Sequence, residues 1–339
     1  MRLSVIIPAY NAEQHLMDCL ISLTKQKIAV EDFEIIVVDD GSTDTTAKIV
    51  TNFAKYHKNI RLESQKNMGN GAARNTGVQI SKGYYIYFLD ADDYLAEDTL
   101  KNVIEVAEKN DLDIIGFNTK KVSNSNHTAS KNRNSNTTDL KVTTGIEFLA
   151  QHNYEAEVWW YITKKSFYLN TGTTFYDRKF VQDSYLTPTL FSKATKVIFM
   201  DYDVHRYRMS LNSITRKKSI AHLNQHFNDL SYSVKKLYEL RMQLLENGVS
   251  NTNCIKRLHV KQQRYVFIII TRFIKSPLPL PQLKNMLNGF IGLEAYPLST
   301  FMSLKDYRSI PYHILTCIYN RTWLLYPLTR IYRTIKMIN

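Results

Sequence analysis

The chain has 339 residues, 44% hydrophobic and 22% charged, so it can form two domains and is too apolar for a disordered tail. Its three widely spaced cysteines argue against a disulfide framework or a zinc cluster and favour a reducing compartment. The net charge of +13 is uneven, because the last 139 residues hold 21 Lys and Arg against 7 Asp and Glu, whereas the first 200 are near neutral.

Neither export nor a membrane-spanning helix is expected. The N-terminal apolar run, Leu3–Ile7, is too short for the apolar part of a signal peptide. The longest apolar run elsewhere is Tyr265–Ile270, whereas about 20 residues are needed to cross a bilayer.

The first 118 residues alternate between strand and helix patterns. Strands are expected at 3–7, 33–38, 59–63, 84–89 and 113–118, and helices at 12–25, 43–57, 71–81 and 95–110. This alternation predicts an α/β fold with a mostly parallel sheet covered on both faces. Ligands of such sheets bind beyond the carboxyl ends of the strands, here just after Ile7, Val38 and Leu89.

The later part of the chain is organised differently. Residues 119–144 contain little to bury and predict a long mobile loop, and shorter aromatic-rich elements follow as far as Tyr207. Long periodic stretches at 223–247 and 254–275 predict helices. We therefore expect one domain at 1–218 and a basic α-helical region at 219–339.

Carboxylates follow two of the predicted strands. Asp39 and Asp40 come after the second strand, where a helix-capping role is as plausible as a binding one. Asp90, Asp92 and Asp93 follow a later strand, and three carboxylates in four residues repel one another unless a cation or hydrogen bonds compensate. Carboxylate oxygens suit Mg²⁺ or Mn²⁺, which also bind phosphates.

Four motifs in this order resemble the family 2 glycosyltransferases, which have the GT-A fold, a Rossmann-like nucleotide-sugar-binding domain. The motifs are SVIIPAYN at 4–11, VVDDGSTD at 37–44, NMGNGAARN at 67–75 and FLDADD at 88–93. The resemblance extends to about Thr215. It implies transfer of a sugar from a nucleotide donor.

The resemblance also implies a nucleotide-binding role for several residues. Pro8 and Tyr10 would line the base pocket, and Asp40 would accept a hydrogen bond from the uracil N3–H, which favours a UDP-sugar as donor. Asn67 and Arg74 would complete the nucleotide site, although Arg74 can also be read as a surface arginine on a helix.

The catalytic and metal-binding residues are implied in the same way. Asp90 would bind the ribose or the sugar, and Asp92 would ligate Mn²⁺ or Mg²⁺, with Asp93 supporting the site. Asp183 would be the base of an inverting transfer, since a base must take the proton of the attacking hydroxyl. Gln182 replaces the glutamate that usually precedes it, and Asp183 can also be read as a helix cap.

A later segment resembles a loop of the family that closes over the diphosphate. Arg208 would pair with phosphate and Ser213 would donate a hydrogen bond to it. His205 and Arg206 replace the two aromatic residues common in the family. The phosphate-binding arginine is therefore either Arg206 or Arg208.

The end of the chain predicts an amphipathic helix at 323–339, opened or kinked at Pro327. On a helical wheel, one face is apolar and the other is cationic; the apolar residues are Leu324, Leu328, Ile331, Ile335 and Ile338, and the cationic ones Arg330, Arg333 and Lys336. This pattern favours a helix that lies on an anionic membrane surface. The alternative is packing of the apolar stripe against 223–275.

These observations predict an inverting, metal-dependent glycosyltransferase that uses a UDP-sugar and a glycan or lipid-linked glycan acceptor. By resemblance, it would act in cell-surface polysaccharide synthesis such as capsule assembly, on the cytoplasmic face of the membrane. Two alternatives are a sugar-nucleotide pyrophosphorylase, whose Gly-rich triphosphate loop is missing after the first strand, and a basic nucleic-acid-binding protein. The last lacks a recognisable motif, so we expect no nucleic-acid partner.

Overall fold

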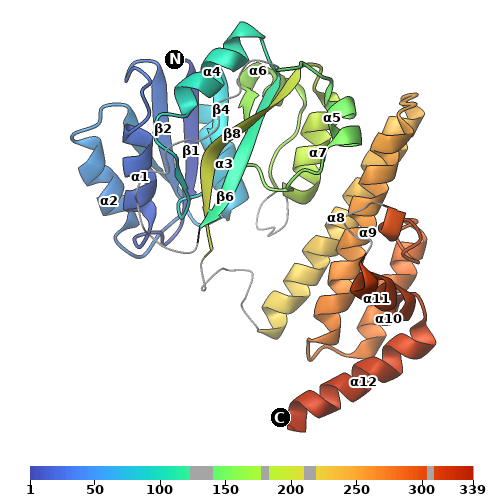
Figure 1. Ribbon diagram of the computed structural model, residues 1–339. Helices are drawn as coiled ribbons and strands as arrows, with labels where there is room; N and C mark the ends of the chain where they lie inside the picture. Colours follow the sequence, from blue (N-terminus) through green and yellow to red (C-terminus); the bar gives the residue numbers. More distant parts are fainter. Residues whose placement is uncertain (123–139, 177–182, 210–218, 304–308, 339) are drawn as a thin grey trace. The chain divides into compact units, whose positions relative to one another are not determined.

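The computed structural model describes residues 1–122, 140–176, 183–209, 219–303 and 309–338. The chain divides into two compact units. The first comprises Met1–Phe148 and Tyr154–Asn212 and holds the β-sheet, and the second comprises Leu149–Asn153 and Ser213–Asn339 and is helical (Figure 1). The domain limits 1–218 and 219–339 stay a prediction, because the change of unit falls within residues that the structure does not describe.

The described part of the first unit contains an eight-stranded sheet in the order β3-β2-β1-β4-β7-β6-β8-β5. The strands are β1 (Leu3–Ala9), β2 (Phe33–Asp39), β3 (Ile60–Ser64), β4 (Tyr85–Phe88), β5 (Tyr94–Leu95), β6 (Ile114–Val122), β7 (Tyr161–Lys164) and β8 (Val197–Arg208). Strands β3, β2, β1 and β4 are parallel, as predicted. The rest is mixed, because β7 runs antiparallel to β4 and β6, and β5 runs antiparallel to β8.

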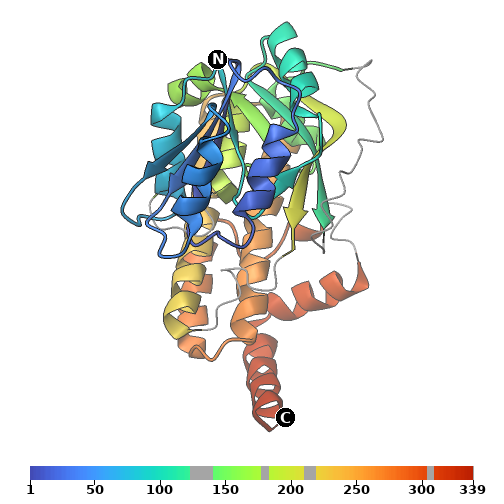
Figure 2. The ribbon, with the colours of Figure 1, turned by 90° about the vertical axis from the view of Figure 1, so that its left-hand side faces the viewer.

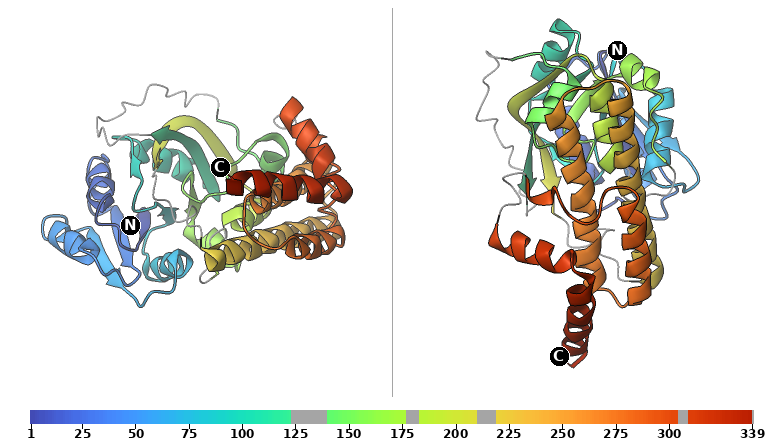
Figure 3. Two further views of the ribbon diagram at one scale, coloured as in Figure 1. Left: turned by 90° about the horizontal axis from the view of Figure 1, so that it is seen from below. Right: turned by 90° about the vertical axis from the view of Figure 1, so that its right-hand side faces the viewer.

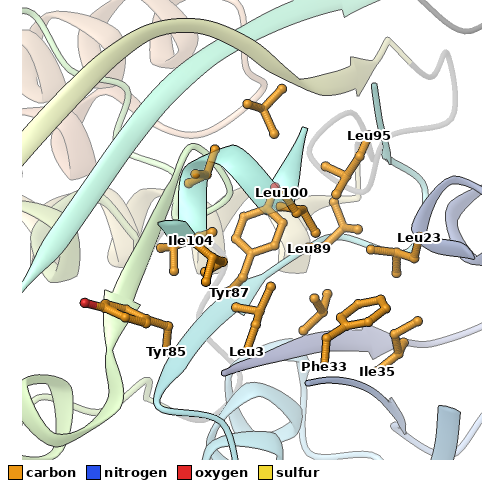
Figure 4. Close-up of a cluster of buried hydrophobic side chains, with 14 of the residues drawn as sticks. Leu3, Leu23, Phe33, Ile35, Tyr85, Tyr87, Leu89, Leu95, Leu100 and Ile104 are labelled. Atoms are coloured by element: carbon orange, nitrogen blue, oxygen red, sulfur yellow. The ribbon is translucent and has the colours of Figure 1, made fainter. Parts of the chain in front are cut away.

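The central strands are buried because helices cover both faces of the sheet. Every residue of β1 and β2 is buried, which is why these strands read as continuous apolar runs. Leu3 pairs in register with Phe33 on one side and Tyr85 on the other, so their side chains share one face (Figure 4). This face forms the main hydrophobic core of the unit.

Seven helices flank the sheet in the described residues of this unit: α1 (Leu16–Thr24), α2 (Thr46–Ala54), α3 (Asn70–Ile80), α4 (Leu100–Lys109), α5 (Gly145–Gln151), α6 (Lys165–Asn170) and α7 (Asp183–Lys193). Helices α1 and α4 contribute to the core that contains Leu3. Helix α3 packs closely against Ile6, since a Cβ atom added at Gly77 would lie 2.3 Å from Ile6 Cγ2. Because Ile6 and Leu3 point to opposite faces of β1, α3 covers the other side.

The prediction of a loop at 119–144 is wrong for residues 119–122. Residues 119–122 continue β6 and pair with residues 205–208 of β8. Ladder hydrogen bonds to a long neighbouring strand stabilise this polar stretch, which has little to bury. Thr143 then forms an isolated bridge with Val197, and residues 123–139 lie outside the described residues.

The second unit is built on two long helices, α8 (Ile220–Glu246) and α9 (Thr252–Ile274), which lie side by side (Figure 3). Both were predicted, and each begins two or three residues earlier than expected. Ser219 and Asn251 cap their first turns by accepting hydrogen bonds from His222 N and Cys254 N. Helices α10 (Leu280–Ile291), α11 (Ile310–Tyr319) and α12 (Thr322–Ile338) contact α9, and a short 3₁₀ turn spans Phe301–Ser303.

The C-terminal helix α12 follows α11 and passes the end of α9 within the helical unit (Figure 2). Its buried positions are Leu325 and Thr329, whereas Ile331 and Ile335 of the predicted apolar stripe are each 55% exposed. The stripe therefore does not pack against 223–275, and Pro327 lies inside the helix instead of opening it. No helix in the described ranges is long and apolar enough to cross a membrane.

Candidate active site

The carboxyl ends of β1, β2 and β4 meet at one edge of the sheet, as their parallel pairing requires. The backbone N–H of Asp40, after β2, donates to the carbonyl of Ala9 at the end of β1 (2.8 Å). Asn11 N donates to Ser42 Oγ (3.0 Å), and Thr43 N donates to Asn11 Oδ1 (2.8 Å). The two turns are therefore held together, and their polar residues converge.

Asp39 and Asp40 have different partners. Asp39 Oδ1 accepts from Ser42 N (3.1 Å) and closes the turn. Asp40 is 2% exposed, and its carboxylate accepts from the Gln65 side chain (2.7 Å) and from the backbone of Met68 (2.9 Å) and Gly69 (2.7 Å). Asp40 thus connects the segment before α3 to the end of β2 by hydrogen bonds. It does not cap the helix that follows β2.

The other residues expected around the base lie near this turn. Pro8 is buried in β1 opposite Val38, whereas Tyr10, just past the strand, is 50% exposed. Asn67 is exposed, and its backbone N would lie 3.0 Å from a Cβ atom at Gly41, which has a φ of +73°. Only glycine adopts this conformation freely and allows so close an approach.

Asp90, Asp92 and Asp93 differ in their surroundings. Asp93 is 1% exposed; its Oδ1 accepts from Arg208 N (2.8 Å), and its Oδ2 lies 3.2 Å from His205 Nε2. Burial raises the pKa of Asp93 well above its usual value and lowers that of His205 to about 3, so the imidazole is neutral at neutral pH.

Asp92 reaches the surface beside this pair. Partial removal from water raises its pKa to about 7, and the carboxylates of Asp93 and Asp90 add to the rise. A carboxylate that is costly to ionise alone is stabilised by a cation. Among the described residues, no three His, Cys, Asp or Glu side chains could hold a metal by themselves. Asp92 instead fits the magnesium pattern of one or two protein carboxylates completed by substrate phosphates.

A buried arginine joins two distant carboxylates. Arg74 on α3 is 2% exposed; its Nη2 lies 2.7 Å from Asp90 Oδ1, and its Nη1 lies 3.2 Å from Asp183 Oδ1. Its guanidinium carbon lies 5.1 Å from the centre of the Phe175 ring. This position argues against the surface-arginine interpretation. We name Asp90, Arg74 and Asp183 the ion chain.

Asp183 is the first residue of α7, and its side chain is 20% exposed. Burial raises its pKa to about 6; the Arg74 guanidinium opposes the rise, and the charges of Asp90 and Glu157 add to it. A carboxyl with a pKa near 6 is a stronger base than an ordinary aspartate and is still ionised at neutral pH. Gln182 lies outside the described residues.

The two candidate phosphate-binding arginines, Arg206 and Arg208, form hydrogen bonds with different residues. Arg206 forms a double contact with Asp203 (2.5 and 2.9 Å). Arg208 lies beside the turn that carries Asp92; its Nε donates to the Asp92 carbonyl (3.0 Å) and its Nη2 to Asp18 Oδ2 (3.0 Å). This placement favours Arg208. Ser213 lies outside the described residues.

Sequence reasoning missed three residues that shape the site. Asp18 holds Arg208 from 190 positions away, Phe175 lies beneath Arg74, and Trp159 stacks on His205 with ring centres 4.6 Å apart. The aromatic-rich segment around Trp159 was noticed, but nothing in its spacing indicates a partner. Asp18 carries no local signal, because it lies in the first turn of α1 like many helix-stabilising acids.

Comparisons with known proteins find glycosyltransferases. The chain is 31% identical over 227 residues to the uncharacterized glycosyltransferase EpsJ of Bacillus subtilis. The aligned segment covers 66% of this chain and 65% of EpsJ. It is 40% identical over 116 residues to a poly(ribitol-phosphate) beta-glucosyltransferase of Bacillus spizizenii, which covers 34% of this chain and 18% of that relative. The chain thus spans less than two thirds of these relatives.

Solved structures share the fold. A crystal structure of residues 1–349 of S. aureus TarS in complex with UDP-GlcNAc matches 98% of this chain and 92% of that one, with a TM-score of 0.71 and 19% identity. The mannosyltransferase PcManGT from Pyrobaculum calidifontis, in complex with GDP-Man and Mn²⁺, matches 94% of this chain and 86% of that one (TM-score 0.52, 16% identity). The family model described as glycosyl transferase family 2 matches residues 4–183, more than half of the chain, and the chain therefore belongs to this family of GT-A-fold glycosyltransferases.

Proposed function

We propose that the chain is an inverting, metal-dependent glycosyltransferase that transfers a sugar from a UDP-sugar to a hydroxyl of a glycan or lipid-linked glycan. The observation that carries this proposal is the ion chain. Arg74 brings the Asp90 and Asp183 carboxylates to one guanidinium, next to the turn that carries Asp92. A donor-binding carboxylate and a base are thus held at one edge of the sheet.

The proposed step needs one proton acceptor and one stabilised leaving group. The acceptor oxygen attacks the anomeric carbon, the bond from that carbon to the phosphate oxygen breaks, and UDP leaves. Asp183 takes the hydroxyl proton, and its raised pKa suits this role. Arg74 keeps the Asp183 carboxylate oriented and limits how far burial raises its pKa.

The leaving diphosphate would meet positive charge at the Asp92 turn. Asp92 would hold Mn²⁺ or Mg²⁺, and the ion would neutralise charge on the departing phosphate. Arg208 is fixed beside Asp92 by Asp18 and by the Asp92 carbonyl, so its guanidinium is oriented before the donor binds. We propose that Arg208 binds a phosphate oxygen and that Ser213 adds a hydrogen bond.

Pro8, Tyr10, Asp40 and Asn67 are proposed to bind the base. Asp40 already accepts three hydrogen bonds, and a carboxylate offers about four acceptor positions, so one position can accept the uracil N3–H. The two matched complexes contain different bases, UDP-GlcNAc in TarS and GDP-Man in PcManGT. The donor test therefore needs both nucleotides.

The test measures nucleoside diphosphate release with a panel of UDP-sugars and GDP-mannose, with and without Mn²⁺. We expect turnover with a UDP-sugar only when Mn²⁺ is present. Asp183→Asn and Asp92→Asn are each expected to lower kcat by about 10²-fold or more. Asp111→Asn is the matched control, because Asp111 lies in an exposed turn with a φ of +49°, which asparagine tolerates. Full turnover by Asp183→Asn would eliminate Asp183 as the base.

We further propose that α12 binds the surface of an anionic membrane, which would place the enzyme at the cytoplasmic face with a lipid-linked acceptor. Ile331 and Ile335 are each 55% exposed, and the chain has no Asp or Glu after Asp306. A helix with exposed apolar residues and excess cations suits an anionic lipid surface.

Sedimentation with phosphatidylglycerol vesicles tests this role of α12. Truncation after Met302 and the substitutions Ile331→Asn and Ile335→Asn should release the protein from the vesicles. Ile291→Asn, equally exposed on α10, should leave binding unchanged. Equal vesicle binding by the unaltered chain, the truncated chain and the three substituted chains would exclude a membrane role for α12.

The two alternatives have less support. A sugar-nucleotide pyrophosphorylase is disfavoured because the family match spans the strand ends and reaches Asp183. Nucleic-acid binding would rest on the net charge alone.

A further inference from the structure

A second recess lies wholly within the helical unit, where the end of α8 meets the start of α9. Its volume is about 360 Å³. The polar side chains that line it are Arg241, Ser250, Thr252, Lys256, His259 and Thr300. Three aliphatic side chains complete the wall, and no Asp, Glu, Phe, Tyr or Trp is among the lining residues. We name it the α8–α9 pocket.

Helical spacing brings these residues together. Thr252, Lys256 and His259 are four and three residues apart on α9 and therefore share one face of that helix. Arg241 lies on the facing side of α8, near its end. Thr300 joins them from the segment between α10 and the 3₁₀ turn. The pocket is thus built from three separate parts of one unit.

The two cations of the pocket are held differently. Arg241 is 5% exposed; its Nη1 donates to Gln262 Oε1 (2.8 Å) and its Nη2 to Glu294 Oε2 (3.1 Å), which fixes the guanidinium. Lys256 is exposed and has no ion-pair partner among the described residues. Since Glu294 balances one cation, the pocket keeps an excess of one positive charge.

His259 and Thr300 are held by hydrogen bonds within the unit, since Thr300 Oγ1 also donates to Gln263 Oε1 (3.0 Å), and Ser250 and Thr252 supply the other hydroxyls. His259 Nε2 lies 2.8 Å from the Glu294 carbonyl, which can only accept, so the ring proton is on Nε2. His259 Nδ1 lies 3.2 Å from Thr300 Oγ1. Thr252 begins α9, where the positive end of the helix dipole favours an anion, and Ser250 lies just before it.

We propose that the α8–α9 pocket binds a phosphate ester with a small aliphatic or polyol substituent. A phosphate offers several oxygens to donors from different directions, here the Lys256 ammonium, the hydroxyls of Ser250 and Thr252 and the start of α9. The aliphatic wall accommodates the organic part. The lack of Phe, Tyr and Trp in the lining disfavours a nucleobase, which would need a stacking partner. This site does not depend on the proposed transfer activity.

The test uses calorimetric titration of the full chain, without a sugar donor, with glycerol 3-phosphate, inorganic phosphate and glycerol. We expect glycerol 3-phosphate to bind more tightly than inorganic phosphate, and glycerol not to bind. Lys256→Ala should weaken glycerol 3-phosphate binding about tenfold, which corresponds to about 1.4 kcal/mol. We chose Lys256 for substitution instead of the buried Arg241, because replacing the exposed Lys256 leaves the packing of the unit intact.

Lys284→Ala is the matched control, since Lys284 is an exposed lysine on α10 that does not line the pocket. A second arm uses phosphatidylglycerol vesicles and the full chain with Ile331→Asn and Ile335→Asn in α12, so that a lipid headgroup and a soluble phosphate ester are distinguished as sources. Binding in either arm that depends on Lys256 and not on Lys284 supports the pocket. Absence of binding at millimolar concentration in both arms, or equal weakening by both substitutions, would overturn the proposal.

Discussion

Replacing Arg74 by methionine tests the ion chain directly. Methionine keeps an unbranched apolar stem but removes both contacts, to Asp90 Oδ1 at 2.7 Å and to Asp183 Oδ1 at 3.2 Å. Arg74 is 2% exposed, so water does not take the place of the guanidinium. Removing one partner of a buried ion pair costs about 3–5 kcal/mol. We expect about 3 kcal/mol, the lower end, because Asp90 is 31% exposed and regains some water.

The loss of unfolding free energy caused by Arg74→Met should depend on pH in a defined direction. Arg74 lowers the pKa of Asp183, which is about 6 with the guanidinium in place, so its removal raises that pKa further. A carboxyl with a raised folded-state pKa destabilises the fold above that pKa, and protonation relieves this below it. The loss of unfolding free energy from Arg74→Met should therefore be larger at pH 8 than at pH 5.

Urea unfolding at pH 8 and pH 5 measures both effects. A Trp323→Phe background leaves Trp159 and Trp160 of the first unit as the only tryptophans, so their fluorescence reports on that unit. Arg2→Met is the matched control, because Arg2 is paired with Glu108 within reach of water and should cost at most about 1 kcal/mol. A cost no greater than that of Arg2→Met, or one that is equal at both pH values, would refute the ion chain.

Three further predictions concern the base and two packing sites. The kcat/KM of the transfer should fall about tenfold per pH unit below about pH 6, because Asp183 must be ionised to act as a base; a pH–rate profile that is flat from 7 to 5 would contradict this. Gly145→Ala should lower the unfolding free energy by about 3 kcal/mol, because its Cβ would lie 1.6 Å from a backbone oxygen of α7. Gly289→Ala on α10 meets open space and should be neutral or stabilising, with urea unfolding of both variants followed by circular dichroism, which also reports on the helical unit. Arg333→Met should lower the midpoint of thermal unfolding by circular dichroism through a loss of about 2 kcal/mol, because Arg333 donates to the carbonyls of Phe273 and Ile274 at the end of α9 and to that of Leu278 just after it. Arg330→Met, at an exposed position of the same helix, should have little effect, and equal losses would argue against this capping role.

The parts of the site that follow strand ends could be predicted from sequence, and the parts made by distant residues could not. Parallel strands force the segments after β1, β2 and β4 to one edge, so the convergence of Tyr10, Asp40 and Asp90 needs only the strand pattern. The bond between Arg74 and Asp183 joins residues 109 positions apart. No local pattern encodes that contact, and only the family resemblance suggested that both belong to one site.

The terminal helix shows a different limit of sequence reasoning. A helical wheel separates apolar from cationic residues correctly, but it cannot say which face is buried. In the structure Leu325 and Thr329 are buried, and the stripe with Ile331 and Ile335 is exposed. Arg333, predicted on the cationic face, donates to carbonyls at the end of α9, where unpaired backbone oxygens favour a cation.

The basic charge of the helical region therefore divides into two kinds. Arg241 and Arg333 are largely engaged by partners within their own unit and serve its stability. Lys256 in the α8–α9 pocket and Arg330 on α12 are exposed and remain available to an anion from outside. Because exposed charges are screened by salt and buried ones much less, vesicle and phosphate binding should weaken with ionic strength while stability changes little. Residues 219–339 contain 16 Lys and Arg against 5 Asp and Glu, and this net charge of +11 overstates what a partner can meet. The argument for an anionic partner rests on the exposed cations alone.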